Sequence, residues 1–324
     1  MRAIIPVAGE GSRLRPHTYS LPKVLINVAG KPIIGHILDK IIEDGFDRAT
    51  IIIGYMGDKI VEYVKSNYKI KCEFVEQEER LGLAHSIFVA KDTIKDEPIL
   101  IILGDTIFDV DLKPVINENY SALGVKYVED PRRFGVAELK NEFISKLIEK
   151  PENPTSNLAL VGLYWIKNPN LLVKCVTDLI DKDIKTRGEY QLTDALQMMV
   201  DMGEKIKVFN VDGWYDCGKP ETLLATNQHL LNKKSNGKST NGMVVIPPVY
   251  ISPRAKIMNS VIGPYTTIAD DAVIMDSIIR NSIINQGAEI EKSLLDNSII
   301  GNNAIVRGAF RRINIGDSSE IDFY

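Results

Sequence analysis

The residue types best suited to chemistry stand in a glycine-containing loop close to the start of the chain. The run from Ala8 to Pro16 reads A-G-E-G-S-R-L-R-P and follows the apolar segment 3–7, which we expect to be a buried strand. Glycines after such a strand let backbone N–H groups approach phosphate oxygens, and the two guanidinium groups offer paired hydrogen bonds to polyphosphate. The dinucleotide motif G-x-G-x-x-G fails here because Leu14 occupies its third glycine position, and the Walker A pattern fails as well. The loop therefore predicts a phosphate site of another kind.

Two aspartates further along the chain are candidate metal ligands. Asp105 follows the apolar run Ile99–Leu103, at the carboxyl end of a predicted strand, where open α/β sheets bind their ligands. Asp216 lies in the segment Trp214–Pro220, which reads W-Y-D-C-G-K-P. Mg²⁺ prefers one or two carboxylates together with phosphate oxygens, so these two aspartates form a chemically sensible pair for a phosphate substrate.

The elements that must position these residues alternate between strand and helix patterns. Such alternation favours a Rossmann-like, mainly parallel sheet covered on both faces. Between residues 122 and 167 the pattern changes to strands separated by turns, which predicts a mixed or antiparallel extension of that sheet. We expect strands at 3–7, 49–53, 72–75, 99–103 and 206–211, and helices at 33–45, 58–66, 83–92, 170–181 and 193–202.

The last third of the chain has a different period. Aliphatic residues return there at steps of five or six, which fits neither an α-helix nor an ordinary strand and is typical of a hexapeptide left-handed parallel β-helix. Antiparallel strands rich in isoleucine are the alternative. We therefore predict a catalytic domain at 1–231, a polar linker at 232–242 and a β-helix at 243–324, with Phe310–Glu320 as a closing coil and capping strand. The repeating positions are Ile251, Ile257, Ile262, Ile268, Ile274, Ile279, Ile284, Ile290, Leu295, Ile300 and Val306.

Composition limits the classes of partner. The chain has 324 residues, 44% of them hydrophobic, and a formal net charge of -4, so neither nucleic acid nor an anionic membrane is an expected partner. Its three cysteines are far apart and form no C-x-x-C pair, which predicts no disulfide framework or zinc site and fits a reducing cytoplasm. We find neither a signal peptide at the start of the sequence nor an apolar run long enough to span a membrane.

Taken together, the motifs resemble those of the sugar-1-phosphate nucleotidylyltransferases. The later segments are similar to glucose-1-phosphate thymidylyltransferase in its long form with a C-terminal β-helix. Small departures from the family pattern occur at Ala8, Ser12, His17, Thr106 and Cys217, and none removes a group that the chemistry needs. The matching segments follow the family order over nearly all of residues 1–230: Gly9–Thr18, Pro22–Lys23, Gly30–Pro32, Glu76–Glu78, Leu81–His85, Gly104–Asp105, Arg133–Glu138, Glu149–Pro151, Arg187–Glu189, Leu192–Asp194 and Trp214–Pro220.

This resemblance implies a role for each group of site residues. Arg13, Lys23 and Lys150 would be catalytic, with Arg13 neutralising the leaving pyrophosphate, and Asp105 and Asp216 would hold Mg²⁺. The Gln77 amide would read the base, since an amide can pair with both the carbonyl and the imide groups of a pyrimidine. The full nucleotide set is Ala8, Gly9, Gly11, Ser12, Arg13, Gln77 and Gly82, and the sugar-phosphate set is Gly135, Glu149, Lys150, Gly162, Glu189 and Trp214.

The implied reaction transfers the nucleotidyl group of a nucleoside triphosphate, first of all dTTP, to glucose 1-phosphate: the sugar phosphate attacks the α-phosphate in line, and a nucleoside-diphosphate sugar and pyrophosphate result. UTP or another sugar phosphate is the main alternative. A bifunctional acetyl- and nucleotidyltransferase is a remoter one, because such acyltransferases need a histidine base and residues 232–324 contain no histidine. A non-catalytic regulatory subunit would be expected to lack Lys23, Asp105, Lys150 or Asp216, and all four are present. The flat sides of a β-helix suit self-association, so we expect a homo-oligomer.

Overall fold

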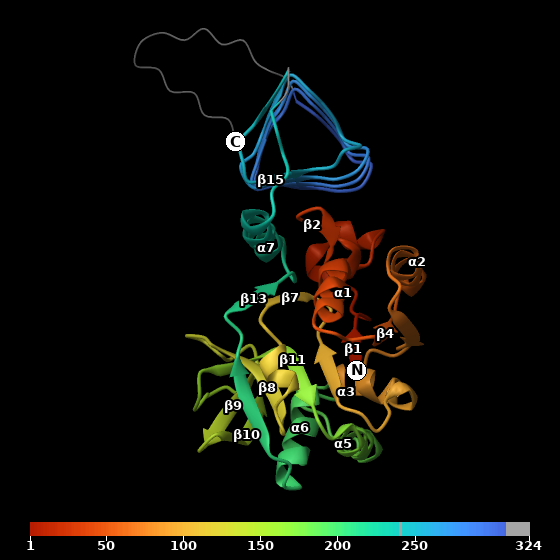
Figure 1. Cartoon of the computed structure of the whole chain (residues 1–324), viewed down its shortest axis with the longest axis vertical. Helices are drawn as coiled ribbons and strands as arrows, with labels where there is room; N and C mark the ends of the chain where they lie inside the picture. Colours follow the sequence, from red (N-terminus) through yellow and green to blue (C-terminus); the bar gives the residue numbers. More distant parts are fainter. Residues whose placement is uncertain (240–241, 309–324) are drawn as a thin grey trace. The chain divides into compact units, whose positions relative to one another are not determined.

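The computed structural model describes residues 1–239 and 242–308, which form two compact units. Unit 1 contains residues 1–26 and 31–226, and unit 2 contains residues 27–30 together with the described chain from Asn227 onward. The closing coil expected at Phe310–Glu320 lies outside the described residues. Figure 1 shows an α/β sheet in the first unit and a triangular stack of short strands in the second.

Unit 1 is built on one nine-stranded sheet. The sequence predicts its Rossmann-like character and its antiparallel extension. The strands run in the order β10-β9-β11-β6-β1-β4-β5, and β8 pairs with both β11 and β12. The strands β6, β1, β4 and β5 are parallel, whereas β11 is antiparallel to β6, β8 and β9. The strands are β1 (Arg2–Pro6), β4 (Arg48–Ile53), β5 (Lys71–Glu76), β6 (Ile99–Ile102), β8 (Ser121–Tyr127), β9 (Gly135–Lys140), β10 (Phe143–Glu149), β11 (Leu158–Ile166) and β12 (Ile206–Asn210).

Helices cover this sheet because its central strands are apolar on both faces. Ile4, Ile52 and Ile101 pack with α3, α5 and α6 in one buried cluster, while α1 and α2 lie on the other side of the sheet (Figure 1). The helices are α1 (Ile33–Glu43), α2 (Gly57–Asn67), α3 (Leu83–Val89), α4 (Lys113–Ile116), α5 (Pro169–Asp181), α6 (Leu192–Asp201) and α7 (Pro220–Lys233). Short 3₁₀ turns occupy Ser12–Leu14, His17–Tyr19, Lys23–Leu25 and Lys91–Thr93, and the remaining strands before unit 2 are β2 (Asn27–Val28), β3 (Lys31–Pro32), β7 (Thr106–Asp109) and β13 (Gly213–Asp216).

Unit 2 is a left-handed parallel β-helix made of three four-stranded sheets. The aliphatic positions singled out by their period all lie in its core or pack against that core. Each sheet takes one strand from every coil, in the orders β14-β17-β20-β23, β15-β18-β21-β24 and β16-β19-β22-β25. The strands are β14 (Met243–Val245), β15 (Val249–Ile251), β16 (Lys256–Met258), β17 (Ser260–Ile262), β18 (Thr266–Ile268), β19 (Val273–Met275), β20 (Ile278–Arg280), β21 (Ile283–Ile284), β22 (Glu289–Glu291), β23 (Leu294–Asp296), β24 (Ile299–Ile300) and β25 (Ile305–Arg307).

The corners of this triangle explain the polar residues between the aliphatic ones. A chain that turns sharply between two strands needs a residue with positive φ, which asparagine, aspartate and glycine accept most readily. Each corner repeats such a residue from coil to coil, so the period of the sequence follows from the geometry of the coil. The repeated positions are Asn259, Asp276 and Lys292 at one corner, Tyr265, Asn281 and Asn297 at the second, and Asp271, Gly287 and Asn303 at the third.

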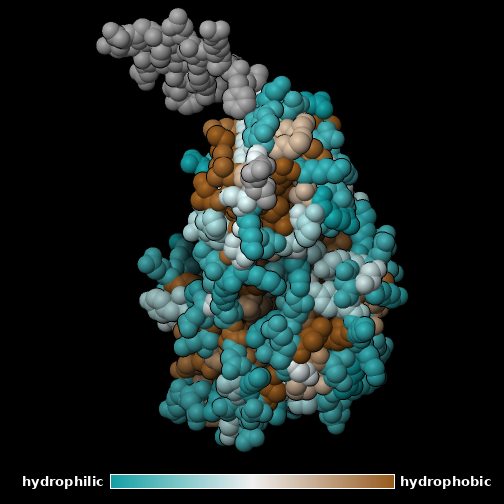
Figure 2. Space-filling model, turned by 45° about the horizontal axis from the view of Figure 1, so that its top comes forward, coloured by the Kyte–Doolittle hydropathy of each residue, from teal (hydrophilic) through white to brown (hydrophobic). Residues whose placement is uncertain are grey.

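The segment expected to be a linker begins within α7 and continues along unit 2. The hydroxyl of Ser235 donates to the backbone carbonyl of Val249, and the Asn236 side chain hydrogen-bonds the backbone of Ile251. The polar composition of this segment therefore has two causes. Some of its residues are exposed to solvent, and others use their side chains to hydrogen-bond a neighbouring strand. Figure 2 shows hydrophilic residues over most of the visible face, with smaller hydrophobic areas between them. Within residues 1–239 and 242–308, we find no helix with the length and apolar character that crossing a membrane requires.

Candidate active site

The glycine loop leaves the carboxyl end of β1 and turns through Gly11. Gly11 has a φ of 66°, and a Cβ there would lie 2.8 Å from Lys23 Cβ, so a larger residue would disturb both the turn and the lysine. The Gly11 carbonyl accepts hydrogen bonds from Leu14 N (2.8 Å) and Thr18 Oγ1 (2.9 Å). The loop is thereby held in a form that presents Ser12 and Arg13.

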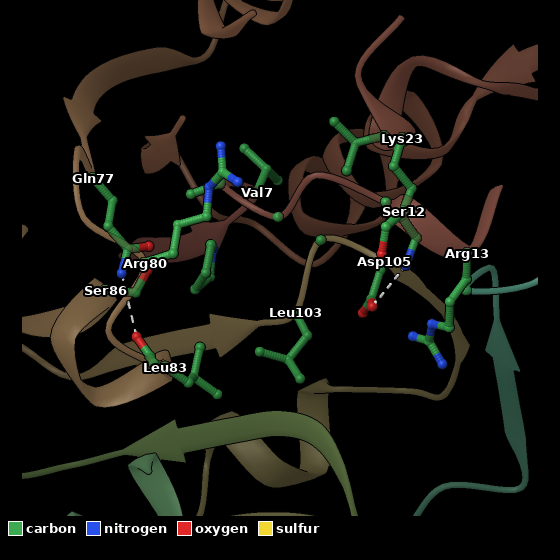
Figure 3. Close-up of a pocket in the computed structure, with 18 of the residues that line it drawn as sticks. Val7, Ser12, Arg13, Lys23, Gln77, Arg80, Leu83, Ser86, Leu103 and Asp105 are labelled. Carbon is green, nitrogen blue, oxygen red and sulfur yellow. Dashed lines mark hydrogen bonds and ion pairs between the residues drawn. The ribbon is translucent and has the colours of Figure 1, made fainter. Parts of the chain in front are cut away.

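A cavity of about 460 Å³ opens beside this loop. Its wall contains all the residues predicted for the nucleotide, namely Ala8, Gly9, Gly11, Ser12, Arg13, Gln77 and Gly82, together with Lys23 and Asp105. Figure 3 shows that Gln77, Ser86 and Leu83 lie at one end, whereas Lys23, Asp105 and Arg13 lie at the other. One end thus offers polar and apolar groups to a base, and the other offers cations to phosphates.

A small antiparallel ladder brings the two aspartates together. β7 and β13 pair so that Asp216 lies opposite Thr106, the residue after Asp105. The Asp105 carbonyl accepts a hydrogen bond from Cys217 N at 3.0 Å, and Gly218 N donates to Asp216 Oδ1 at 2.8 Å. Two carboxylates that are 111 positions apart in sequence are therefore neighbours at the carboxyl edge of the sheet.

Lys23 neutralises Asp105 directly. Its Nζ lies 2.9 Å from Asp105 Oδ2, and its side chain is 9% exposed, whereas that of Asp105 is 40% exposed. Burial opposes ionisation of this carboxyl, but the charge of Lys23 and the hydrogen bonds from Lys23 and Thr106 hold the pKa of Asp105 below its ordinary value. Asp105 is therefore a carboxylate at neutral pH, as a metal ligand must be.

The donor set fits a magnesium ion that also binds the substrate. Among the residues described, no cluster of three or more histidine, cysteine or acidic side chains is placed to hold a metal on its own. Mg²⁺ is commonly coordinated by one or two carboxylates, with phosphate oxygens of the substrate as further ligands. The two neighbouring aspartates beside the cavity fit this kind of coordination. A Cβ at Gly218 would lie 2.7 Å from Asp216 Oδ1 and 3.0 Å from Arg13 Nη2, so glycine keeps the space between them open.

A second cavity, of about 420 Å³, contains most of the sugar-phosphate set. Gly135, Glu149, Lys150, Gly162 and Trp214 all line it, together with Asp216. The Thr193 hydroxyl donates to Glu149 Oε2 at 2.7 Å, and Lys150 Nζ lies 3.3 Å from Glu149 Oε1. β9 and β10 pair so that Gly135 lies opposite Glu149, and a Cβ at Gly135 would lie 2.9 Å from Thr193 Oγ1. This glycine leaves room for a ligand to reach the carboxylate.

The two cavities meet at one wall. Arg13, Leu83, Leu103 and Asp105 line both of them, so a group bound in one cavity can touch a group bound in the other. Arg13 and Asp105 are the charged members of this shared wall. The geometry brings together two cavities, cationic side chains suited to phosphate and a pair of carboxylates suited to a metal ion.

The structure separates some residues that the sequence grouped. Arg15, which stands in the same loop as Arg13, points elsewhere: it lies 3.2 Å from Glu10 and over the Tyr19 ring. Glu189, which we expected beside the sugar phosphate, lines the nucleotide cavity. Of the two arginines that we expected to contact polyphosphate, only Arg13 lines a cavity.

Several cavity residues were missed by sequence reasoning. Arg80 and Ser86 line the nucleotide cavity, and Tyr164, Gln191 and Thr193 line the sugar cavity. Ser86 is 2% exposed, and no hydrogen-bond partner for its hydroxyl is found in the part of the chain that the structure describes. Arg80, Ser86 and Thr193 stand inside or next to the matched motifs, and this position in the sequence is the feature that could have predicted them as cavity residues.

The cysteine beside the aspartates takes no part in this chemistry as a nucleophile. Cys217 is fully buried, and this burial raises the pKa of its thiol to about 12. A thiol with so high a pKa is protonated at neutral pH and does not attack phosphorus. Among the described residues that line the cavities, we find groups for charge neutralisation and positioning and no nucleophile activated by a base.

Comparison with known proteins agrees with this geometry. The chain is 42% identical over 257 residues to the bifunctional protein GlmU of Methanocaldococcus jannaschii, covering 78% of this chain and 60% of that protein. It is 31% identical over 321 residues to the glucose-1-phosphate thymidylyltransferase of Streptomyces griseus, covering 90% of this chain and 88% of that protein. The chain thus spans about 60% of the length of the GlmU relative and most of the thymidylyltransferase.

Structural and family comparisons point the same way. A crystal structure of UDP-glucose pyrophosphorylase complexed with UDP-glucose superposes with a TM-score of 0.62 at 24% identity, covering 72% of this chain and 99% of that one, and so shares the fold. The model of the nucleotidyl transferase family matches residues 2–233, which include every predicted site residue. The chain therefore belongs to the nucleotidyl transferase family.

Proposed function

We propose that this protein transfers a nucleotidyl group from a nucleoside triphosphate to a sugar 1-phosphate and releases pyrophosphate. The observation that carries this proposal is the pair of cavities that share Arg13 and Asp105 in one wall. Such an arrangement suits a direct reaction between two phosphate-bearing substrates, because transfer of this kind needs positioning and charge neutralisation more than covalent catalysis.

The residues that line each cavity suggest the chemistry. A phosphate oxygen of the sugar 1-phosphate attacks the α-phosphorus of the nucleotide in line, a new P–O bond forms, and the bond to the pyrophosphate oxygen breaks on the opposite side. Lys150 and Glu149 hold the sugar phosphate and a sugar hydroxyl, so that the attacking oxygen faces the shared wall. Arg13 and Lys23 bind the oxygens on which negative charge accumulates.

We assign Mg²⁺ to Asp105 and Asp216. When bound, the ion would neutralise phosphate oxygens and favour departure of pyrophosphate. When the metal ion is absent, Lys23 keeps Asp105 ionised. When the ion binds, Lys23 competes with it for the Asp105 carboxylate, since Lys23 Nζ lies 2.9 Å from Asp105 Oδ2. The protein's own contribution is therefore a preformed pair of carboxylates in a fixed register.

Our proposed substrates are dTTP and glucose 1-phosphate, with UTP as the alternative nucleotide. The match to a thymidylyltransferase over most of both chains supports this choice. The GlmU relative is named a bifunctional protein, yet no histidine follows His229 in this sequence, so we propose no acyl transfer by the β-helix. A cytoplasmic location, where these substrates are present, belongs to the same proposal.

Pyrophosphate release is the test of this function. With Mg²⁺ and glucose 1-phosphate, we expect turnover with dTTP to exceed that with UTP, GTP, CTP or ATP. No turnover is expected when either the sugar phosphate or the metal ion is left out. Turnover with UTP alone would keep the reaction and change the base. No turnover with any nucleotide, across a panel of hexose 1-phosphates, would contradict the reaction and favour a regulatory subunit.

We also propose that the β-helix mediates self-association. Register pairs Val244, Val261, Ile278 and Leu294 across one sheet, and three of these aliphatic residues are at least 42% exposed. An outward apolar row of this kind suits a second copy of the chain. Light scattering should give a mass above 36.2 kDa, and Leu294→Lys should lower it. A monomer for the unaltered chain at micromolar concentration would contradict self-association.

A further inference from the structure

The end of the nucleotide cavity that is remote from Asp105 contains the buried side-chain amide of Gln77, and both N–H groups of this amide have partners within the protein. Gln77 follows β5 directly and is 6% exposed, and its backbone N–H donates to Ile53 O at 2.9 Å, which continues the pairing of β5 with β4. Its side chain lines the cavity. A buried amide is selective only if its oxygen and nitrogen cannot exchange places.

Both N–H groups of this amide have acceptors within the protein. Gln77 Nε2 lies 3.3 Å from the Gly82 carbonyl oxygen and 3.1 Å from His85 Nδ1. A carbonyl oxygen can only accept, so the side of the amide that faces Gly82 must be the NH₂ group. The second N–H then points at His85, and Nδ1 of that histidine must be the unprotonated, accepting nitrogen.

The two acceptors are themselves held in place. Gly82 has a φ of 119°, its carbonyl also accepts from Ser86 N at 3.1 Å, and a Cβ on it would lie 2.5 Å from the Tyr190 carbonyl oxygen. His85 lies in α3, with its ring stacked on Phe88 at 6.3 Å. Burial lowers the pKa of His85, although the nearby Glu79 acts in the opposite direction. The lowered pKa favours the neutral imidazole at neutral pH, in agreement with an accepting Nδ1.

The amide oxygen is the group that remains for the ligand. Figure 3 shows the Gln77 oxygen turned into the cavity, while its nitrogen faces away along the dashed hydrogen bond. Uracil and thymine carry an N–H at N3, which an oxygen accepts, whereas N3 of cytosine is itself an acceptor. An acceptor fixed in this orientation favours the first two bases and opposes the third.

We propose that His85 is a positioning residue that favours uracil and thymine over cytosine: together with the Gly82 carbonyl it locks the Gln77 amide with its oxygen toward the base. This proposal rests on the proposed function, since it assumes that the cavity binds a nucleotide. His85 touches the amide and does not line the cavity. The selectivity thus depends on a residue behind the one that meets the base, and on which ring nitrogen of that residue carries the proton.

The first test does not depend on turnover. Nitrogen-15 NMR of the nucleotide-free protein at pH 7.5 distinguishes the two neutral tautomers of each of the four histidines. The signal that disappears in His85→Asn belongs to His85. We expect its Nε2 to carry the proton and its Nδ1 to be bare. A proton on Nδ1 would overturn the proposal, whether or not the protein turns over any nucleotide.

The second test compares two substitutions. In His85→Leu the amide loses one of the two acceptors that fix it and keeps only the longer contact to the Gly82 carbonyl, so its orientation is held less firmly. We therefore expect the preference for dTTP or UTP over CTP, in both Kd and kcat/KM, to fall by about ten-fold or more. His85→Asn keeps a side-chain carbonyl that accepts the same N–H, so we expect it to retain most of the preference. An unchanged preference in His85→Leu would overturn the proposal. Because Kd is measured without sugar phosphate, an enzyme that binds nucleotides but turns none over would count against the proposed function and not against His85.

Discussion

Asp105→Asn is expected to lower kcat/KM by about 10²–10³-fold and to raise the Mg²⁺ concentration needed for half-maximal activity. The amide that replaces the carboxylate is a weaker metal ligand, and Asp216 alone would hold the ion. The same substitution removes the partner of Lys23, whose charge is 9% exposed and would lose its counter-ion. A lower melting temperature should therefore accompany the loss of activity.

A double variant separates these two effects. Lys23→Met in the Asp105→Asn background removes the unpaired charge, so the melting temperature should recover while the activity stays low. Asp212→Asn is the matched control, because this exposed aspartate lies just before β13 and lines neither cavity. Activity within two-fold of the parent in Asp105→Asn would exclude Asp105 as a metal ligand, and an equal loss in Asp212→Asn would point to a general disturbance of the chain.

Much of this site could be predicted because local sequence reports local geometry. The glycine loop after β1 can be predicted from the sequence because a positive φ and close packing against Lys23 require a glycine at position 11. The β-helix can be predicted because each coil repeats both its inward aliphatic residues and its corner residues. In both places the backbone geometry of a short segment restricts which residue types can stand there, so those residue types predict the geometry.

The relations between distant segments could not be predicted in the same way. The ladder of β7 and β13 joins residues about 100 positions apart, and no local pattern in the sequence predicts this pairing. Only resemblance and ligand chemistry connect the two aspartates in the sequence. Arg15 and Glu189 show the limit of motif reasoning, because standing in a matched segment does not determine the direction of a side chain. The orientation of the Gln77 amide is a further case, since it depends on a carbonyl and an imidazole that only the fold brings together.

Arg13→Ala should reduce kcat by about 10³-fold, a larger effect than any other single substitution in the glycine loop. Arg13 is one of two charged residues in the wall that both cavities share. Among the residues described, none forms an ion pair with its guanidinium, so its charge remains available to a phosphate. Its removal affects the step in which negative charge passes to pyrophosphate, and KM should therefore change less than kcat.

The neighbouring arginine provides the matched control. Arg15→Ala removes the same side chain from the same loop, yet Arg15 pairs with the exposed Glu10 and lines neither cavity, so kcat should stay within about three-fold of the parent. Arg13→Lys keeps the charge without the paired N–H groups and should recover only part of the rate. Equal losses in Arg13→Ala and Arg15→Ala would show that the loop needs positive charge in general. A loss confined to Arg13, and seen in kcat, would place that guanidinium on the phosphate as the P–O bond breaks.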